Sequence, residues 1–204
     1  ELEVMAVPGG SGCGGGDGST GMGSVTEIGT GDSGTTVQLV ATLDAAKSNV
    51  YAMAGTSDLT MTFPAAFQVA APFGADIGGV NPAFFPVNAA AEFDSYLTVG
   101  PTDGTAGAAI SSIGVDFDSW TASAGIEADN GAVFWMDPAS GPNGAVVMAQ
   151  ITNDGAGSAT ATLQGRSVDG ADWSEPISWS WGAGGGDCGS SDGVVQIGSS
   201  DAGT

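Results

Sequence analysis

The sequence predicts an all-β protein, an antiparallel β-sandwich of about 9–11 strands with jelly-roll or immunoglobulin-like connections. Three observations lead to this prediction. Apolar and polar residues alternate with a period of two in many short segments, as in strands that bury one face. These segments recur roughly every ten residues, which is typical of sandwiches and barrels. Asx-Gly pairs, which favour tight turns, separate several of them.

The expected strands are short runs of alternating or β-branched residues. In chain order they are 24–29, 36–44, 49–54, 59–63, 93–99, 111–118, 132–136, 144–152, 158–166, 176–181 and 193–197. The turn pairs between them are Asp103-Gly104, Asn130-Gly131, Asn143-Gly144, Asp154-Gly155 and Asp169-Gly170. The glycine of each pair can adopt the positive φ that tight turns need.

The segment 64–92 differs from the rest because it is rich in proline and phenylalanine. Proline interrupts strand ladders, so we expect a long ordered loop over one end of the sandwich, anchored by its phenylalanines. The predicted organisation is an N-terminal Gly-rich arm (1–23), one β-sandwich domain (24–181) and a C-terminal Gly-rich arm with a short strand (182–204).

Charge excludes several classes of function. The chain has two basic residues, Lys47 and Arg166, against 23 acidic ones, and no histidine, for a net charge of −21. Nucleic-acid binding depends on Lys and Arg, and imidazole chemistry depends on His. No nucleophile elbow, phosphate loop or zinc-ligand spacing is present, and no carboxylate pair is distinguished as a glycosidase pair. We therefore expect neither an enzyme nor a nucleic-acid-binding protein, and no cofactor.

The chain begins with Glu1 and has no apolar run long enough to span a bilayer, so we expect a mature secreted product without membrane insertion. Cys13 and Cys188 each lie in a Gly-rich stretch near one end. In an oxidising compartment they would pair and join the two ends.

Both ends of the chain also carry short apolar segments that are candidates for assembly. These contain Val4, Met5 and Val7 at one end and Val194, Val195 and Ile197 at the other. Apolar strands on Gly-rich arms can complete the sheet of a neighbouring copy by strand addition. The alternative is that each segment pairs within its own sandwich.

Two ligand sites remain as alternatives to purely structural roles. Asp116 and Asp118 would point to one face of the strand 111–118, where they could bind calcium or form a solvated acidic face. Trp179 and Trp181 share a strand face with Ile177. Exposed, these two rings would stack on sugars, whereas buried, they would belong to the core.

Between residues 67 and 173 the order of motifs resembles a family of secreted, Gly- and Asp-rich domains. The motifs are NPAFFP (81–86), EFDSYLTVG (92–100), IGVDFD (113–118) and a strand ending in QGR. Such domains are associated with surface and matrix proteins of marine planctomycete-type bacteria and unicellular algae. The resemblance implies an extracellular location and brings no catalytic residue with it.

These observations predict a secreted structural subunit of an extracellular filament, sheath or matrix. Its main partners would be copies of itself, joined by terminal strand exchange and close packing, together with glycans or other matrix proteins. The alternative is an extracellular carbohydrate-binding or adhesion module, with or without calcium.

Overall fold

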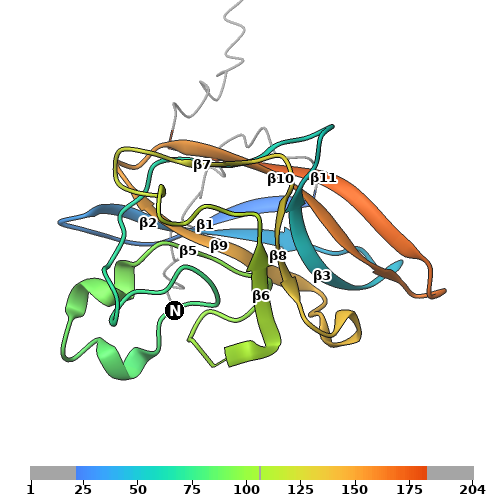
Figure 1. Ribbon diagram of the computed structural model, residues 1–204, viewed down its shortest axis with the longest axis horizontal. Coiled ribbons are helices and arrows are strands. Elements are labelled where there is room, and N and C mark those ends of the chain that lie inside the picture. The colour runs from blue at the N-terminus through green and yellow to red at the C-terminus, as the bar shows by residue number, and fades with distance from the viewer. Residues whose placement is uncertain (1–21, 106, 183–204) are drawn as a thin grey trace, which may run out of the picture. The chain divides into compact units, whose positions relative to one another are not determined.

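Two antiparallel sheets pack face to face through the alternate apolar residues of their strands (Figure 1). The structure is a computed structural model that describes residues 22–105 and 107–182. These residues form eleven strands and four short 3-10 helices, so the prediction of an all-β sandwich is confirmed.

Sheet A has four strands in the order β1-β2-β9-β5. Their bounds are Gly23–Gly31 (β1), Gly34–Thr42 (β2), Ala145–Asn153 (β9) and Tyr96–Leu97 (β5). β1 and β2 form a hairpin, and β2 pairs with β9 from Thr35–Asn153 to Thr42–Ala145. Residues that are distant in sequence therefore lie side by side in the middle of this sheet.

Sheet B is built around the long strand β10, which pairs with β11 along its whole length. Its strands are β3 (Lys47–Gly55), β4 (Met61–Phe63), β6 (Ile110–Ile113), β7 (Ile126–Ala128), β8 (Gly131–Trp135), β10 (Gly157–Ser167) and β11 (Asp172–Trp181). β4 follows β3 on the same side of β10, and β7 and β8 pair with β4 and β3 respectively. β3-β4 and β7-β8 thus act as two interrupted strands, and β6 pairs with β8 at the edge.

The core lies between the two sheets. The largest fully buried side chains include Leu39, Met53, Met61, Leu97, Met148, Ile151, Leu163, Ile177 and Trp179. The indole Nε1 of Trp179 donates to the carbonyl oxygen of Val40 at 2.9 Å, which joins β11 of sheet B to β2 of sheet A. A buried indole needs such a partner, because an unpaired N–H in the core is costly.

The predicted strands differ most from the structure in the middle of the chain. The strand expected at 111–118 ends at Ile113, because Gly114 turns the chain with a φ of 66°. The strand expected at 93–99 has only two paired residues, and β7 was not predicted at all. The expected strand 193–197 lies outside the described residues.

The Pro/Phe-rich loop is ordered, as predicted, but it lies on the outer face of sheet A instead of over one end of the sandwich (Figure 1). It contains the short helices η1 (Pro82–Phe84) and η2 (Ala89–Phe93). The two other 3-10 turns are η3 (Gly107–Ala109) and η4 (Pro138–Ser140). The anchoring of the loop differs from the expectation. Phe84 is 39% exposed and pairs edge-on with Phe73, so hydrogen bonds to sheet A hold the loop instead of buried phenylalanines.

Candidate functional site

The two tryptophans proposed as a sugar-stacking platform belong to the core. Trp179 is 1% exposed and Trp181 is 9% exposed, on the same face of β11 as buried Ile177. A ring packed between two sheets cannot stack on a sugar. The burial therefore decides between the two alternatives in favour of the core, and the stacking role for this pair is withdrawn.

The two candidate calcium ligands, Asp116 and Asp118, do not lie on a strand. They follow Gly114 in an exposed turn, where Asp116 Oδ1 accepts a hydrogen bond from the Ser119 backbone N–H at 3.3 Å. This is a local turn contact, and the expected alternation on a strand face is absent. In the described part of the chain, no three or more Asp, Glu, Cys or His residues form a group that could hold a metal ion.

The remaining candidates lie at the two ends of the chain. The proposed disulfide cysteines, Cys13 and Cys188, are outside the described residues. The same holds for the assembly residues Val4, Met5, Val7, Val194, Val195 and Ile197. Their roles stay predictions from the sequence.

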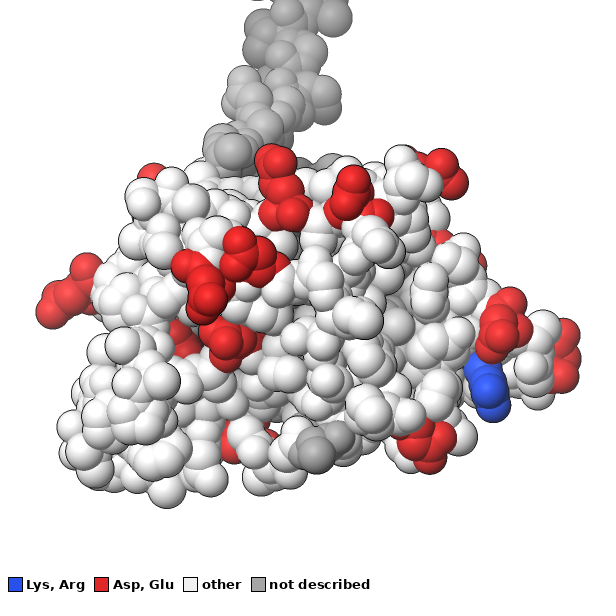
Figure 2. Space-filling model, in the orientation of Figure 1, with Lys and Arg blue, Asp and Glu red and all other residues white. Residues whose placement is uncertain are grey.

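Both basic side chains take part in ion pairs on the surface of the sandwich. Lys47 Nζ lies 2.6 Å from Asp44 Oδ2 and 3.1 Å from Glu175 Oε1, and 5.3 Å from the centroid of the Trp173 ring. Arg166 Nε lies 3.6 Å from Asp172 Oδ1. Figure 2 shows a basic group at one end beside acidic ones, while acidic side chains are spread over the rest of this face. A phosphate or sulfate would therefore meet mainly repulsion on this face.

A buried carboxylate, that of Asp94, joins distant parts of the loop that covers sheet A. The oxygens of Asp94 accept the backbone N–H groups of Val69 and Ala75, each at 2.7 Å. Burial raises the pKa of Asp94 to about 6, and the nearby charge of Asp76 adds to the rise, although the backbone N–H groups oppose it. The carboxylate is fully enclosed, so its evident role is to hold the loop.

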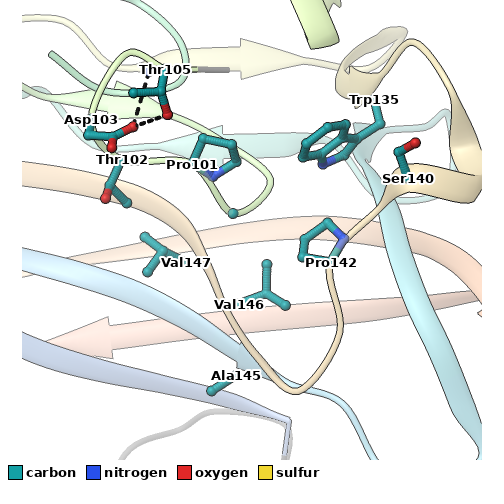
Figure 3. Close-up of a pocket in the computed structure, with 11 residues that line it drawn as sticks. Pro101, Thr102, Asp103, Thr105, Trp135, Ser140, Pro142, Ala145, Val146 and Val147 are labelled. Atoms are coloured by element: carbon teal, nitrogen blue, oxygen red, sulfur yellow. Dashed lines mark hydrogen bonds between the residues drawn. The ribbon is translucent and has the colours of Figure 1, made fainter. Parts of the chain in front are cut away.

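An open cleft of about 530 Å³ lies where the loop 100–105 meets β8 and the start of β9 (Figure 3). Its floor is formed by Ala145, Val146 and Val147, and its walls include Trp135, Pro101 and Pro142. Asp103 lies at one end of it. A cleft of this volume is within the range of small-molecule sites.

Sequence reasoning missed this cleft. Trp135 lies in a uniformly apolar run (132–136), so alternation could not show which face of the strand its ring occupies. Asp103 was identified only as a turn residue.

Comparison with family models, with curated proteins and with solved structures finds no match to this chain. In the described residues no helix is long and apolar enough to cross a membrane.

Proposed function

We propose that this protein is a secreted structural subunit of an extracellular filament, sheath or matrix. In this proposal, copies join through their terminal segments, and the sandwich is the rigid body that those segments connect. The observation that carries the proposal is the position at which the two segments leave the sandwich.

Both ends of the described chain lie at strand β11. Gly23 begins β1 so close to β11 that a Cβ at this residue would lie 2.7 Å from the carbonyl oxygen of Ser178. β11 ends at Trp181, and Gly182 is the last described residue. Four residues of extended strand span about 13 Å, so the two terminal segments start near each other. This placement supports both a joint role in assembly and a disulfide between the two ends.

The edges of the sandwich favour assembly through separate segments, because each edge strand is either short or carries a residue or a register shift that disfavours pairing with another strand. β5 has two residues and β6 has four. β11 carries Pro176, which cannot donate a ladder hydrogen bond. On β1, the charged Glu27 lies on the core side opposite Val37, and the pairing register shifts directly after it. Such features prevent uncontrolled edge-to-edge pairing.

Charge gives the assembly its expected salt dependence. A chain of net charge −21 repels its copies, and the Debye length falls from about 30 Å at 0.01 M salt to about 3 Å at 1 M. We expect association to increase over this range. Light scattering after size exclusion, together with negative-stain electron microscopy of the full chain, would measure it.

Two variants distinguish assembly through the terminal segments from assembly through the surface of the sandwich. The double substitution Val194→Asp and Val195→Asp should abolish assemblies, because two charges cannot enter an apolar strand pairing. Val168→Asp places the same charge on a residue that is 69% exposed in the β10–β11 turn, and should leave assembly unchanged. Monomers alone at every salt and protein concentration would overturn the proposal.

A further inference from the structure

The cleft beside Trp135 has no part in the assembly proposed above, yet it has the features of a ligand site. The indole is held in a fixed orientation, because Nε1 donates to the Val99 carbonyl oxygen at 2.8 Å. Its polar atom is therefore satisfied within the protein. The half-buried ring lies beside Pro101 and Pro142, which gives this end of the cleft a rigid apolar wall (Figure 3).

The opposite end of the cleft is a carboxylate. Asp103 Oδ1 accepts hydrogen bonds from the backbone N–H and the hydroxyl of Thr105, at 3.0 and 2.5 Å. These bonds orient the carboxylate and hold the pKa of Asp103 below its usual range. Oδ2 takes part in none of the hydrogen bonds found among the described residues. An ionised, oriented acceptor of this kind suits a hydroxyl donor, since O–H···O⁻ bonds are among the stronger hydrogen bonds.

Anionic ligands do not fit the cleft. Lys and Arg are absent from its lining, and Asp103 would repel a phosphate, sulfate or uronate. A small cation held by the ring and the carboxylate together does not fit either, because Pro101 lies between Asp103 and Trp135 (Figure 3). The two groups suit an elongated ligand that touches both.

A peptide strand is also a poor occupant, because the backbone of β9 beside the cleft is already paired with the loop at Val147 and Met148. Gly100 N–H donates to the carbonyl oxygen of Val147 at 2.9 Å, and Thr98 N–H donates to that of Met148 at 2.9 Å. β2 pairs with the other side of β9. The floor therefore lacks the row of free backbone groups that strand addition requires.

We infer that this cleft binds an uncharged oligosaccharide, with one sugar ring packed on Trp135 and a hydroxyl of another donating to Asp103. Sugar rings combine an apolar C–H face with a rim of hydroxyl donors, which is the pair of chemistries that the cleft provides. The inference does not depend on the assembly role, because a single copy of the sandwich supplies every group.

The test is titration calorimetry of the full chain with four neutral hexasaccharides: cellohexaose, laminarihexaose, xylohexaose and mannohexaose. Binding of at least one is expected. Trp135→Ala should weaken it about tenfold, since an aromatic stacking contact is worth about one such factor in affinity. Asp103→Asn should weaken it about fivefold through loss of the charge-assisted bond.

Trp173→Ala is the matched control. Trp173 is also half-buried and its Nε1 also donates to a backbone carbonyl oxygen, that of Asn49 at 3.1 Å, but it lies outside the cleft. Affinity should stay within about twofold of the unmodified protein, a change that lies within roughly 0.5 kcal/mol. If Trp135→Ala does not fold, the Trp135 indole N–H signal of the unmodified protein should still shift on titration, and Asp103→Asn still reports on the cleft.

Three outcomes would overturn the inference. One is the absence of binding by all four sugars at millimolar concentration. Another is equal binding by the Trp135→Ala and Trp173→Ala variants, which would place the sugar elsewhere. The last is binding of tetramethylammonium or a decaproline peptide in preference to every sugar, which would assign the cleft to another ligand class.

Discussion

The central strands β2 and β9 of sheet A are buried on both faces, one face by apolar side chains and the other by polar ones. Toward sheet B, Val37 and Leu39 of β2 face Ile151 and Ala149 of β9, and all four are apolar core residues. On the other face of the same strands, Thr36 lies opposite Thr152 and Gln38 opposite Gln150. The loop 64–95 covers this second face, so Thr36, Thr152 and Gln150 are each at most 5% exposed.

Individual hydrogen bonds hold the loop against sheet A. Gln150 Nε2 donates to the carbonyl oxygens of Glu92 and Asp94, at 3.1 and 2.9 Å. At the adjoining edge of β9, the Thr152 N–H donates to Ser95 Oγ at 2.9 Å, and the Thr152 carbonyl oxygen accepts the Phe67 N–H at 2.7 Å. Apolar burial is non-directional, whereas a buried polar group is favourable only with its partner in place. The inner face should therefore determine overall stability, and the outer face should determine how the loop is positioned.

The largest expected effect is on the inner face. Leu39→Ala removes a side chain with no exposed surface and leaves a cavity between the sheets. We expect the free energy of unfolding to fall by about 3 kcal/mol, within the usual range of 2–5 kcal/mol for such a truncation. Urea denaturation followed by fluorescence would measure the change. Val168→Ala, at a residue 69% exposed, should change the free energy by less than about 0.5 kcal/mol. Equal effects of the two variants would contradict the assignment of the inner face as the core.

The second effect is a pH dependence that belongs to the outer face. The pKa of Asp94 is raised by burial to about 6, above the value near 4 of an unfolded chain. Between these values the folded state binds the proton more tightly than the unfolded state. Stability should therefore rise by up to about 3 kcal/mol as the pH falls from about 6 to about 4.

Other acidic groups help to define this pH window. The pKa of Asp76 is also raised, by burial and by the charge of Asp118, so it acts in the same direction. The pKa values of Asp44, Asp103 and Asp137 are lowered by hydrogen bonds, so their contributions are lost only at more acidic pH. Denaturation midpoints measured from pH 4 to 7 would show the rise, and Asp94→Asn should reduce it. An unchanged slope in that variant would show that Asp94 is not its source.

The inner face could be predicted from the sequence, and the outer face could not. Alternation separates the apolar from the polar positions of β2 and of β11, and in the structure the apolar positions Val37, Leu39, Ile177 and Trp179 are buried. The same rule predicts a solvated face for Thr36 and Gln38. Thr36 and Gln38 are covered because the loop 64–95 packs on them. The sequence of β2 alone does not predict this contact.

The candidate site shows the same limit. Trp179 and Trp135 are both tryptophans on strands. Alternation with Ile177 made the core one of two alternatives for Trp179, and the structure shows it buried, whereas no pattern indicated a role for Trp135. The cleft brings together Asp103 from a turn, Trp135 from β8 and Val147 from β9. Their proximity follows from the pairing of the loop 98–100 with β9, which local sequence patterns do not report.

The smallest expected effect isolates one polar pair of the outer face. The hydroxyls of Thr36 and Thr152 lie 2.7 Å apart across β2 and β9, and both are buried. Thr36→Val or Thr152→Val alone leaves the other hydroxyl without its partner and should cost about 1–2 kcal/mol. The double variant removes both hydroxyls and retains similar side-chain volume. Its cost should therefore be smaller than the sum of the single costs by about 1 kcal/mol, as a double-mutant cycle in urea would measure. Additive costs would mean that the pair contributes only through shape, and that the outer face is held in the same way as the inner one.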